Sequence, residues 1–311
     1  MKPIMISGHN PMTGPRHLGH LVSTMADWPS LEDKYELYIV IDDLIASVLY
    51  PRGRAQIINR TFNIAREFFA TGINPAKSHV ILTSMVPEVH ELAFFTGLML
   101  DIEWLNKLYK ESFGGLLGSF QRYELGLPRL CSVTEAVYPQ TALATMTVCL
   151  GATAFQGGEE MRGYLHIIDA ICEKAGRRLG LQKPQFLTSR STFLLGTDGR
   201  HMASENAIYL SSSEGELQRD IKKVKSPDVF RDWYSALGQE NLAKKVDDPL
   251  NANSFRKMHE VLAATFKPFR ESQMLNTDIA VALEDSALAA RETLCSRLAK
   301  IKKAFGIPGY S

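Results

Sequence analysis

A glycine-rich turn near the amino terminus restricts the possible folds more than any other part of the sequence. Residues 7–20 read Ser-Gly-His-Asn-Pro-Met-Thr-Gly-Pro-Arg-His-Leu-Gly-His. The apolar run at residues 4–6 before them predicts a buried strand, and residues 21–26 after them can form a helix. The glycines let the backbone approach a polyphosphate closely, and a helix start directs unpaired N–H groups at it. This order of elements predicts a phosphate-binding site.

Two histidines in this turn, His17 and His20, are three residues apart. If the helix begins at Leu18, both imidazoles face the same ligand. Donors in that place would stabilise the charge that builds on a phosphorus during transfer. Taken alone, these residues fit equally well a loop whose histidines have no chemical role, so a second motif has to decide.

The next segments alternate between strand and helix patterns. Residues 35–41 and 80–82 are β-rich apolar runs, and residues 51–71 carry apolar positions at helical spacing. Alternation of this kind predicts a parallel doubly wound sheet and not a sandwich. Asp42 follows the first of these strands, so its carboxyl group is expected to open onto the same crevice as the glycine-rich turn.

The composition describes an ordinary globular chain of one large or two modest domains. The 311 residues are 45% hydrophobic and 22% charged, with a formal net charge of +1, which gives no global signal for nucleic acid. The four cysteines show no C-x-x-C pair, which indicates neither a zinc site nor a disulfide framework. No signal-peptide pattern and no apolar run of membrane-spanning length is present, so we expect a cytoplasmic protein without a membrane anchor.

A second glycine-containing stretch, residues 196–210, reads Gly-Thr-Asp-Gly-Arg-His-Met-Ala-Ser-Glu-Asn-Ala-Ile-Tyr-Leu. Together the two stretches resemble the two signatures of class I aminoacyl-tRNA synthetases. Residues 17–20 match the first signature, and residues 200–205 take the place of the Lys-Met-Ser-Lys-Ser loop. Their order and separation resemble the tryptophanyl members. So do further short landmarks along the chain, at residues 39–42, 71–75, 86–88, 138–139, 158–160 and 206–208.

The resemblance implies a fold and a division of the chain. The implied fold is α/β, with a Rossmann-type doubly wound parallel sheet, a helical insertion and an all-α carboxyl-terminal domain. We expect a catalytic domain over residues 1–210, with the insertion at about 88–135, and the helical domain over residues 211–311. Because the insertion helps to form a dimer interface in the family, the resemblance also implies a homodimer.

The resemblance implies activation of an amino acid carboxylate by ATP and Mg²⁺ to an aminoacyl-adenylate, with release of pyrophosphate. The residues expected to stabilise phosphate charge are His17, His20, Arg200 and His201. The expected nucleotide contacts are Gly8, Asn10, Gly19, Glu160 and Met202. The expected amino acid pocket comprises Met5, Asp42, Tyr138, Ala142, Thr145 and Met161. No residue is assigned to a metal.

The expected amino acid pocket departs from the family pattern. In tryptophanyl enzymes the helix after Tyr-Pro carries a Met that packs on the indole and an Asp that accepts its N–H. Counting from Tyr138, these positions hold Ala142 and Thr145. The lost carboxylate removes a charge-assisted hydrogen bond of the kind that discriminates strongly between substrates. Met161 replaces a Gln of the family and offers no useful polar contact. These differences predict an amino acid other than tryptophan; a register shifted by one turn, or Thr145 as a substitute acceptor, are the alternatives.

The second signature departs furthest, because residues 200–205 contain no lysine. His201 and Ser204 stand where the family has the two lysines that bind the pyrophosphate of ATP. A lysine is permanently charged near neutral pH, whereas a histidine is mostly neutral there unless a phosphate raises its pKa. Arg200 is the expected compensator, since a guanidinium can bind a phosphate through two donors.

The carboxyl-terminal third is expected to be helical. Ser213 and Glu216 have the spacing of a capping box, and a basic stretch, residues 219–225, is either a solvated helix face or the edge of a tRNA surface. Three functions remain open. The first, which the altered pocket favours, is a ligase that activates a different amino acid in a biosynthetic pathway, with an acceptor that need not be tRNA. The second is an authentic tryptophan–tRNA ligase, and the third is a binding or regulatory relative without catalysis.

Overall fold

The computed structural model describes residues 2–49, 53–101, 103–104, 107, 143–158, 161–188, 193–272 and 274–307. Three of the expected site residues, Tyr138, Ala142 and Glu160, lie outside these ranges, as does most of the expected insertion at about 88–135.

The described part of the chain is built on a five-stranded sheet whose strands all run parallel. The strands are β1 (Ile4–His9), β2 (Glu36–Ile41), β3 (Ser78–Leu82), β4 (Ala154–Gln156) and β5 (Gln185–Leu187). Their spatial order is β3-β2-β1-β4-β5, so the direction of winding reverses between β1 and β4. A ligand crevice is expected at the carboxyl ends of the strands on either side of such a reversal. The glycine-rich turn leaves β1 at this point, and the expected doubly wound fold is confirmed.

Helices cover both faces of the sheet, because successive strand residues point to opposite sides. One face, with Leu37 and Ile39 of β2, packs with α1 (Leu18–Ser23), α2 (Trp28–Leu31) and α4 (Arg54–Phe69). The other face, with Tyr38 and Val40, packs with α5 (Glu88–Gly97), the helical residues 143–150 and α9 (Arg162–Leu179). A short helix, α3 (Asp43–Leu49), follows β2. The helix expected at 51–71 is therefore α4.

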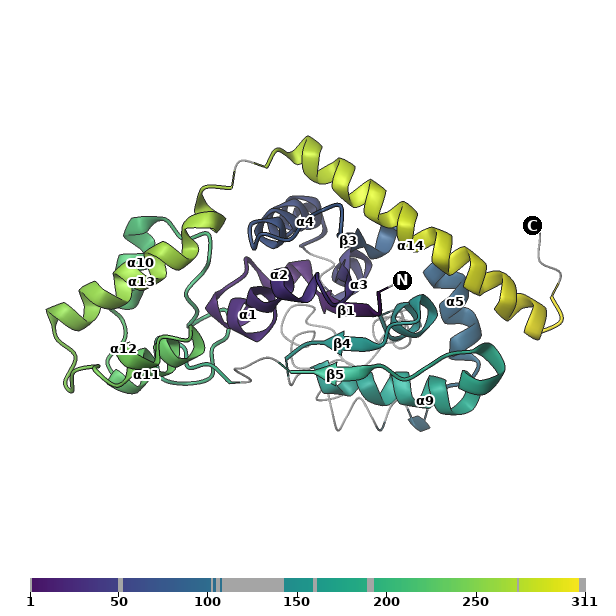
Figure 1. Cartoon of the computed structure of the whole chain (residues 1–311), viewed down its shortest axis with the longest axis horizontal. Helices are drawn as coiled ribbons and strands as arrows, with labels where there is room; N and C mark the ends of the chain where they lie inside the picture. The colour runs from purple at the N-terminus through teal and green to yellow at the C-terminus, as the bar shows by residue number, and fades with distance from the viewer. Residues whose placement is uncertain are drawn as a thin grey trace.

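A group of helices follows the second signature and forms what we call the helical unit: α10 (Glu214–Ile221), α11 (Pro227–Ala236), α12 (Glu240–Ala243) and α13 (Ala252–Arg270). It lies at the opposite end of the molecule from α5 and α9 (Figure 1). The predicted capping box is present, since Ser213 Oγ accepts from Glu216 N and the Glu216 carboxylate accepts from Ser213 N. Trp233 and Phe266 are fully buried in a core that is continuous with the α1 face of the sheet.

The last helix, α14 (Asn276–Ala304), leaves the helical unit and returns across the β3 edge of the sheet (Figure 1). Ile279 and Leu283 pack with the α1 face, whereas Leu294 and Ile301 pack with the opposite face. Arg291 is anchored to Glu88 of α5, with 2.9 Å between Nη2 and Oε1. The expected boundary at residue 210 stays a prediction, but by its contacts α14 belongs with the sheet.

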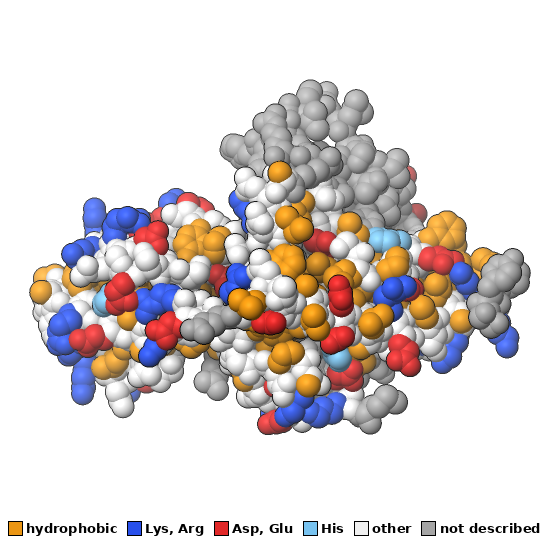
Figure 2. All heavy atoms as spheres, turned by 90° about the horizontal axis from the view of Figure 1, so that it is seen from above, with side chains coloured by type: hydrophobic (Ala, Val, Ile, Leu, Met, Phe, Trp, Pro, Cys, Tyr) orange, Lys and Arg blue, Asp and Glu red, His pale blue; other side chains and the backbone are white. Residues whose placement is uncertain are grey.

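The surface over α14 is mixed in character. Figure 2 looks onto this helix and shows apolar side chains dispersed among charged ones, with Lys and Arg concentrated at the helical unit on the left. Within the described residues, we find no helix with the length and hydropathy that crossing a bilayer requires.

Candidate active site

The turn that leaves β1 is held by its own backbone and by Arg16. Asn10 Oδ1 accepts from Met12 N at 2.8 Å, which starts a short 3-10 helix at Pro11–Thr13. Gly14 follows with φ 91°, a conformation that favours glycine. The Arg16 guanidinium lies inside the turn and donates through Nη2 to Asn10 O, Thr13 Oγ1 and Gly14 O at 3.2, 2.8 and 2.8 Å. The expected nucleotide residue Asn10 thus shapes the turn through both its side chain and its carbonyl.

The signature histidines lie where α1 begins, as the sequence predicted. His20 Nδ1 accepts from the His17 backbone N–H at 3.2 Å, and the two rings are 3.9 Å apart between centroids. Burial, reinforced by the nearby Arg16 charge, lowers the pKa of His17 to about 3 and that of His20 well below its ordinary value. Both imidazoles are therefore neutral at physiological pH, and the ring hydrogen of His20 is on Nε2. They can stabilise phosphate charge as hydrogen-bond donors and not as cations.

Two further features make this helix start suitable for a ligand. A Cβ at Gly19 would lie 2.9 Å from His17 Cε1, so only glycine leaves the backbone accessible beside the ring. His17 Nδ1 is buried without a hydrogen-bond partner. A buried polar atom without a partner is costly, and a bound phosphate oxygen is one group that would satisfy it.

The second signature is organised by one buried side chain, Asn206. Its Oδ1 accepts from Ala203 N at 2.7 Å, while its Nδ2 donates to Asp198 Oδ1 at 2.7 Å and to His201 O at 3.0 Å. A Cβ at Gly196 would lie 2.3 Å from the Asn206 side chain, so the glycine is required for this packing. The loop is thus closed upon itself.

The basic residues of this loop, Arg200 and His201, make side-chain contacts with Asp198 and Phe193, although His201 is near enough to His17 for its charge to lower the pKa of His17. The Arg200 side chain is 78% exposed and forms an ion pair with Asp198 at 2.5 Å. The His201 ring stacks on Phe193 at 4.4 Å between centroids. Their expected roles towards phosphate stay predictions.

The two signatures meet through main-chain hydrogen bonds. Leu18 N donates to Ile208 O at 2.9 Å, and Leu210 N donates to Arg16 O at 2.9 Å. Met202 is only 5% exposed and lies beside Gly19, with its sulfur 3.5 Å from a Cβ placed there. Met202 was expected to contact the same nucleotide as the start of α1, and it packs directly against that helix start.

Three described residues of the expected amino acid pocket, Met5, Asp42 and Thr145, are buried. Met5 is fully buried in the core of the α1 face. The expected nucleotide residue Gly8 lies against Leu143, whose Cδ2 is 2.5 Å from a Cβ placed at Gly8. Thr145 is also fully buried, and its Oγ1 is 2.6 Å from Thr96 Oγ1. Thr96 Oγ1 also lies 3.1 Å from the Leu92 carbonyl, so the two hydroxyls belong to one buried hydrogen-bonded group.

Two other expected pocket residues show different environments. Met161 folds back on Gly157, with its Cβ and Cγ 2.7 Å from a Cβ placed there, so it fills space at the start of α9. Asp42 is buried, and Ile45 N donates to its Oδ1 at 3.0 Å while its Oδ2 has no partner. Burial raises the pKa of Asp42 to about 7, and the neighbouring Asp43 adds to this increase.

Several residues of the site were not predicted from the sequence. Arg16 directly precedes the first signature in the sequence, but it was not chosen as a site residue because a lone arginine usually occupies a solvated position. Gln156 of β4 accepts from the indole of Trp28 at 2.9 Å, and Trp28 packs edge-on against His9. This pairing joins residues 128 positions apart, and no local pattern indicates it.

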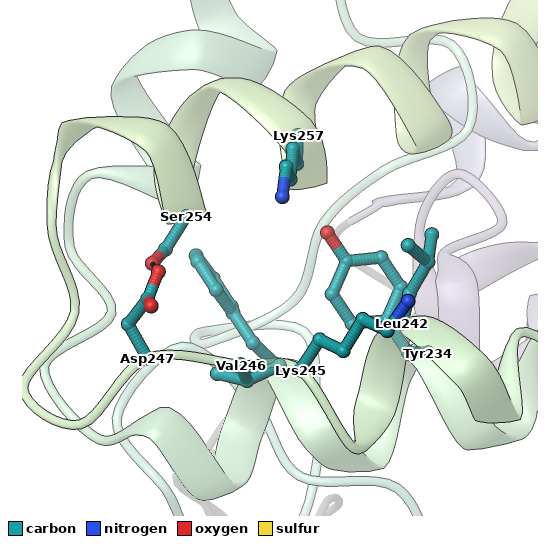
Figure 3. Close-up of a pocket in the computed structure, with 8 residues that line it drawn as sticks. Tyr234, Leu242, Lys245, Val246, Asp247, Ser254 and Lys257 are labelled. Atoms are coloured by element: carbon teal, nitrogen blue, oxygen red, sulfur yellow. Dashed lines mark hydrogen bonds between the residues drawn. The ribbon is translucent and has the colours of Figure 1, made fainter.

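Two cavities among the described residues lie near the site or in the helical unit. A groove of about 410 Å³ borders the junction of the signatures and is lined by Pro15, Tyr209, Ser211, Ser212, Glu216, Arg219, Asp220 and Lys223. A second cavity lies within the helical unit between Tyr234 of α11, Leu242 of α12 and Lys257 of α13 (Figure 3). Its volume of about 10 Å³ is that of about one water molecule, which excludes an amino acid or nucleotide there.

Comparison with known families gives one match that spans most of the chain. The profile of the family described as tRNA synthetases class I (W and Y) matches residues 1–287. A tryptophan–tRNA ligase from Thermotoga maritima is 27% identical over 227 residues, covering 71% of this chain and 66% of the relative. A tryptophan–tRNA ligase from Clostridium longisporum is 25% identical, covering 100% of this chain and 98% of the relative.

Solved structures give the same fold. Tryptophanyl-tRNA synthetase from Campylobacter jejuni, complexed with ADP and tryptophan, superposes with a TM-score of 0.81 at 19% identity, covering 98% of this chain and all of that one. The enzyme from Mycoplasma pneumoniae has a TM-score of 0.80 at 14% identity, with 99% of each chain covered. Tyrosyl-tRNA synthetase from Archaeoglobus fulgidus has a lower TM-score of 0.60 at 18% identity, with 96% and 90% covered.

Proposed function

The chain belongs to the class I tRNA synthetases of the tryptophan and tyrosine group, a family of ligases that form aminoacyl-adenylates, and we propose that it activates tryptophan with ATP for transfer to tRNA. The observation that carries this proposal is the junction of the two signatures. The hydrogen bonds from Leu18 N to Ile208 O and from Leu210 N to Arg16 O bring together two motifs separated by more than half of the chain. A phosphate bound at the start of α1 would lie beside both.

The residues present fit a nucleotide. Gly19 leaves the backbone at the start of α1 open beside the His17 ring, and His17 Nδ1 is buried without a partner. ATP supplies the α-phosphorus that the amino acid carboxylate attacks and the pyrophosphate that leaves. In this proposal His17 and His20 donate hydrogen bonds to phosphate oxygens as negative charge builds on them, and the dry surroundings strengthen those bonds.

We further propose that Mg²⁺ enters with the nucleotide. Within the described residues, no group of three or more His, Cys, Asp or Glu side chains is placed to hold a metal ion. Mg²⁺ commonly keeps several waters and binds through substrate phosphates, so this arrangement is compatible with it. No residue of this chain is assigned as its ligand.

Tryptophan is the preferred amino acid because curated relatives along the full length of the chain are tryptophan–tRNA ligases, and because the Campylobacter jejuni enzyme was solved with tryptophan. This proposal replaces the preference for a different acid that the sequence alone suggested. A different amino acid remains the second candidate on one observation. Thr145 has no carboxylate to accept an indole N–H, and its hydroxyl is hydrogen-bonded to the Thr96 hydroxyl at 2.6 Å.

Transfer to tRNA, action in the cytoplasm and assembly as a homodimer are part of the same proposal. The groove at the signature junction is lined on one side by Arg219 and Lys223 of the basic stretch, which offers charge for an acceptor end. Asp220 lies within 2.7 Å of Lys223, so part of this charge is paired within the protein. The basic stretch at residues 219–225 therefore supports an acceptor less strongly than its composition suggested.

Amino-acid-dependent exchange of labelled pyrophosphate into ATP tests the activation step. We expect exchange with tryptophan, and charging of its tRNA when that tRNA is added. Exchange with another amino acid alone would establish the second candidate and name its substrate. A folded protein that binds ATP without any exchange would overturn the catalytic proposal in favour of a binding or regulatory role.

A further inference from the structure

The Arg16 guanidinium is a buried cation at the edge of the candidate nucleotide site. Arg16 is 1% exposed, and all three oxygens that it binds belong to the turn at residues 10–14. Two of these oxygens are main-chain carbonyls. One side chain therefore fixes the shape of the segment that joins β1 to α1, which is the segment predicted to face a polyphosphate.

This guanidinium keeps its charge without a carboxylate in hydrogen-bonding contact. The buried carboxylate of Glu67 accepts instead from the backbone N–H of Arg16, at 2.9 Å, and Arg16 Nε is buried without a partner. Burial lowers the pKa of Arg16 to about 10, against the opposing effect of the nearby Glu67 charge, which leaves the group charged at neutral pH. Burying a charge in this way is costly unless a nearby opposite charge repays it.

The other basic side chains of the two signatures, residues 10–20 and 196–210, do not offer a buried positive charge for the phosphates. Arg200 is exposed and paired with Asp198, and His201 is stacked on Phe193. His17 and His20 are kept neutral by burial. The segment that replaces the lysine-containing loop therefore leaves the phosphates without a free cation from that side.

We propose that Arg16 is a positioning residue that holds the 10–14 turn as a phosphate cradle and supplies, from behind it, the fixed positive charge that the lysine-free second signature lacks. This inference rests on the proposed function, since it requires ATP in the crevice beside α1. The charge acts through the turn, and the negative charge of the triphosphate adds to the partial compensation that the Glu67 carboxylate gives.

The test compares variants that remove the charge with variants that remove only a contact to the turn. Arg16→Met removes both, Arg16→Lys keeps the charge with fewer donors, and Thr13→Val removes one acceptor and leaves the charge. Arg60→Met is the matched control, because Arg60 of α4 also holds the turn, donating to Met12 O at 3.0 Å, but lies in a partly exposed position.

The measurements are KM and kcat for ATP and for the amino acid in pyrophosphate exchange, ATP affinity by calorimetry, and urea unfolding of each variant. For Arg16→Met we expect KM for ATP to rise roughly 10-fold to 100-fold, less than the 10²–10³ that loss of a direct donor costs, with KM for the amino acid within about twofold. Arg16→Lys should recover most of the ATP affinity, and Thr13→Val and Arg60→Met should change it less than about threefold.

Two results would overturn the inference: an Arg16→Met protein that is less stable but has unchanged KM for ATP, or an Arg16→Lys protein as impaired as Arg16→Met. If Arg16→Met does not fold, the lysine variant decides alone, since a loss of ATP affinity as large as that expected for Arg16→Met would contradict a charge role. A wild-type protein that binds ATP without exchange would refute the proposed function, and calorimetry would still judge Arg16. A wild-type protein that does not bind ATP would refute both.

Discussion

The two signature segments have opposite physical characters. The first, around α1, is buried, its histidines are neutral, and its charge is held inside the turn by three hydrogen bonds. The second, around Asn206, is closed by its own hydrogen bonds, and its arginine points outwards in a pair with Asp198. In this chain the buried charge lies in the first segment, and the second segment packs against it.

The largest expected effect on the exchange rate comes from a substitution in the buried first signature. Replacing His20 by Ala removes the Nε2–H donor, and loss of one preorganised donor typically lowers kcat by about 10²–10³. Pyrophosphate exchange at saturating substrates measures it. His166→Ala, an exposed histidine of α9, is the control and should retain full activity. If the His20→Ala protein kept more than a third of the wild-type rate, the first signature would have no catalytic role.

The next largest effect is expected for Asn206. Its substitution tests whether the second signature depends on its internal hydrogen bonds. Asn206→Ala leaves the Ala203 N–H and the His201 carbonyl without their side-chain partner, so we expect a loss of about 1–3 kcal/mol in the free energy of unfolding. We also expect KM for ATP to rise, because the loop that lies on the first signature loses its shape. Urea unfolding and exchange kinetics test both, with the exposed Asn63→Ala as the comparison. Unchanged stability would show that the loop is held from elsewhere.

Asp42 provides a pH-dependent test on the β2 side. Its pKa is raised to about 7 in the folded chain from 3.8, so the folded state keeps a proton that the unfolded state releases. Its contribution to stability is therefore lost as the pH rises from about 4 to 7. His17, with its pKa lowered to about 3, acts in the opposite direction below pH 6.5, but it is present in both proteins compared.

For Asp42→Asn we expect the gain in unfolding free energy over wild type to be larger at pH 8 than at pH 4.5, by roughly 1–3 kcal/mol. Urea unfolding at the two pH values measures this difference, and Asp33→Asn, an exposed carboxylate, serves as the control. A gain that is equal at both pH values would show that the Asp42 carboxyl is ionised in the folded protein throughout this range.

The smallest effect is expected for Arg200. Because its guanidinium is exposed and paired with Asp198, Arg200→Met should change kcat/KM for ATP by less than about threefold. This contrasts with the effect expected for Arg16→Met in the same assay. A loss of tenfold or more would mean that Arg200 leaves Asp198 to bind phosphate, and the contrast between the two segments would no longer hold in the loaded enzyme.

The sequence predicted those features whose causes are local. Apolar runs predicted β1, β2 and β3, helical spacing predicted α4, and the Ser213–Glu216 spacing predicted the start of α10. Glycines at 14 and 19 were predicted to shape a phosphate turn, and each has a physical reason to be glycine: a left-handed φ at Gly14 and the adjacent His17 ring at Gly19.

What the sequence did not predict depends on contacts between distant residues. The partner of Thr145 is Thr96 and that of Trp28 is Gln156, and neither pairing follows from spacing. Arg200 was chosen as the compensating cation because it occupies the signature loop, yet its neighbour Asp198 takes the guanidinium. Arg16 was passed over because burial, which makes its charge significant, is a tertiary property. The fold was thus predictable from the residues, and the electrostatics of the site were not.

The return of α14 to the sheet gives the helical unit two covalent attachments, one at residues 211–213 and one at 271–275. Both attachments are fixed on the sheet side, since Leu210 N donates to Arg16 O and Arg66 of α4 donates to the carbonyl of Met274 at 3.2 Å. The helical unit also shares one continuous apolar core with the α1 face of the sheet. It is therefore mechanically coupled to the sheet at both ends and through its core, and one of these links is the main chain of Arg16.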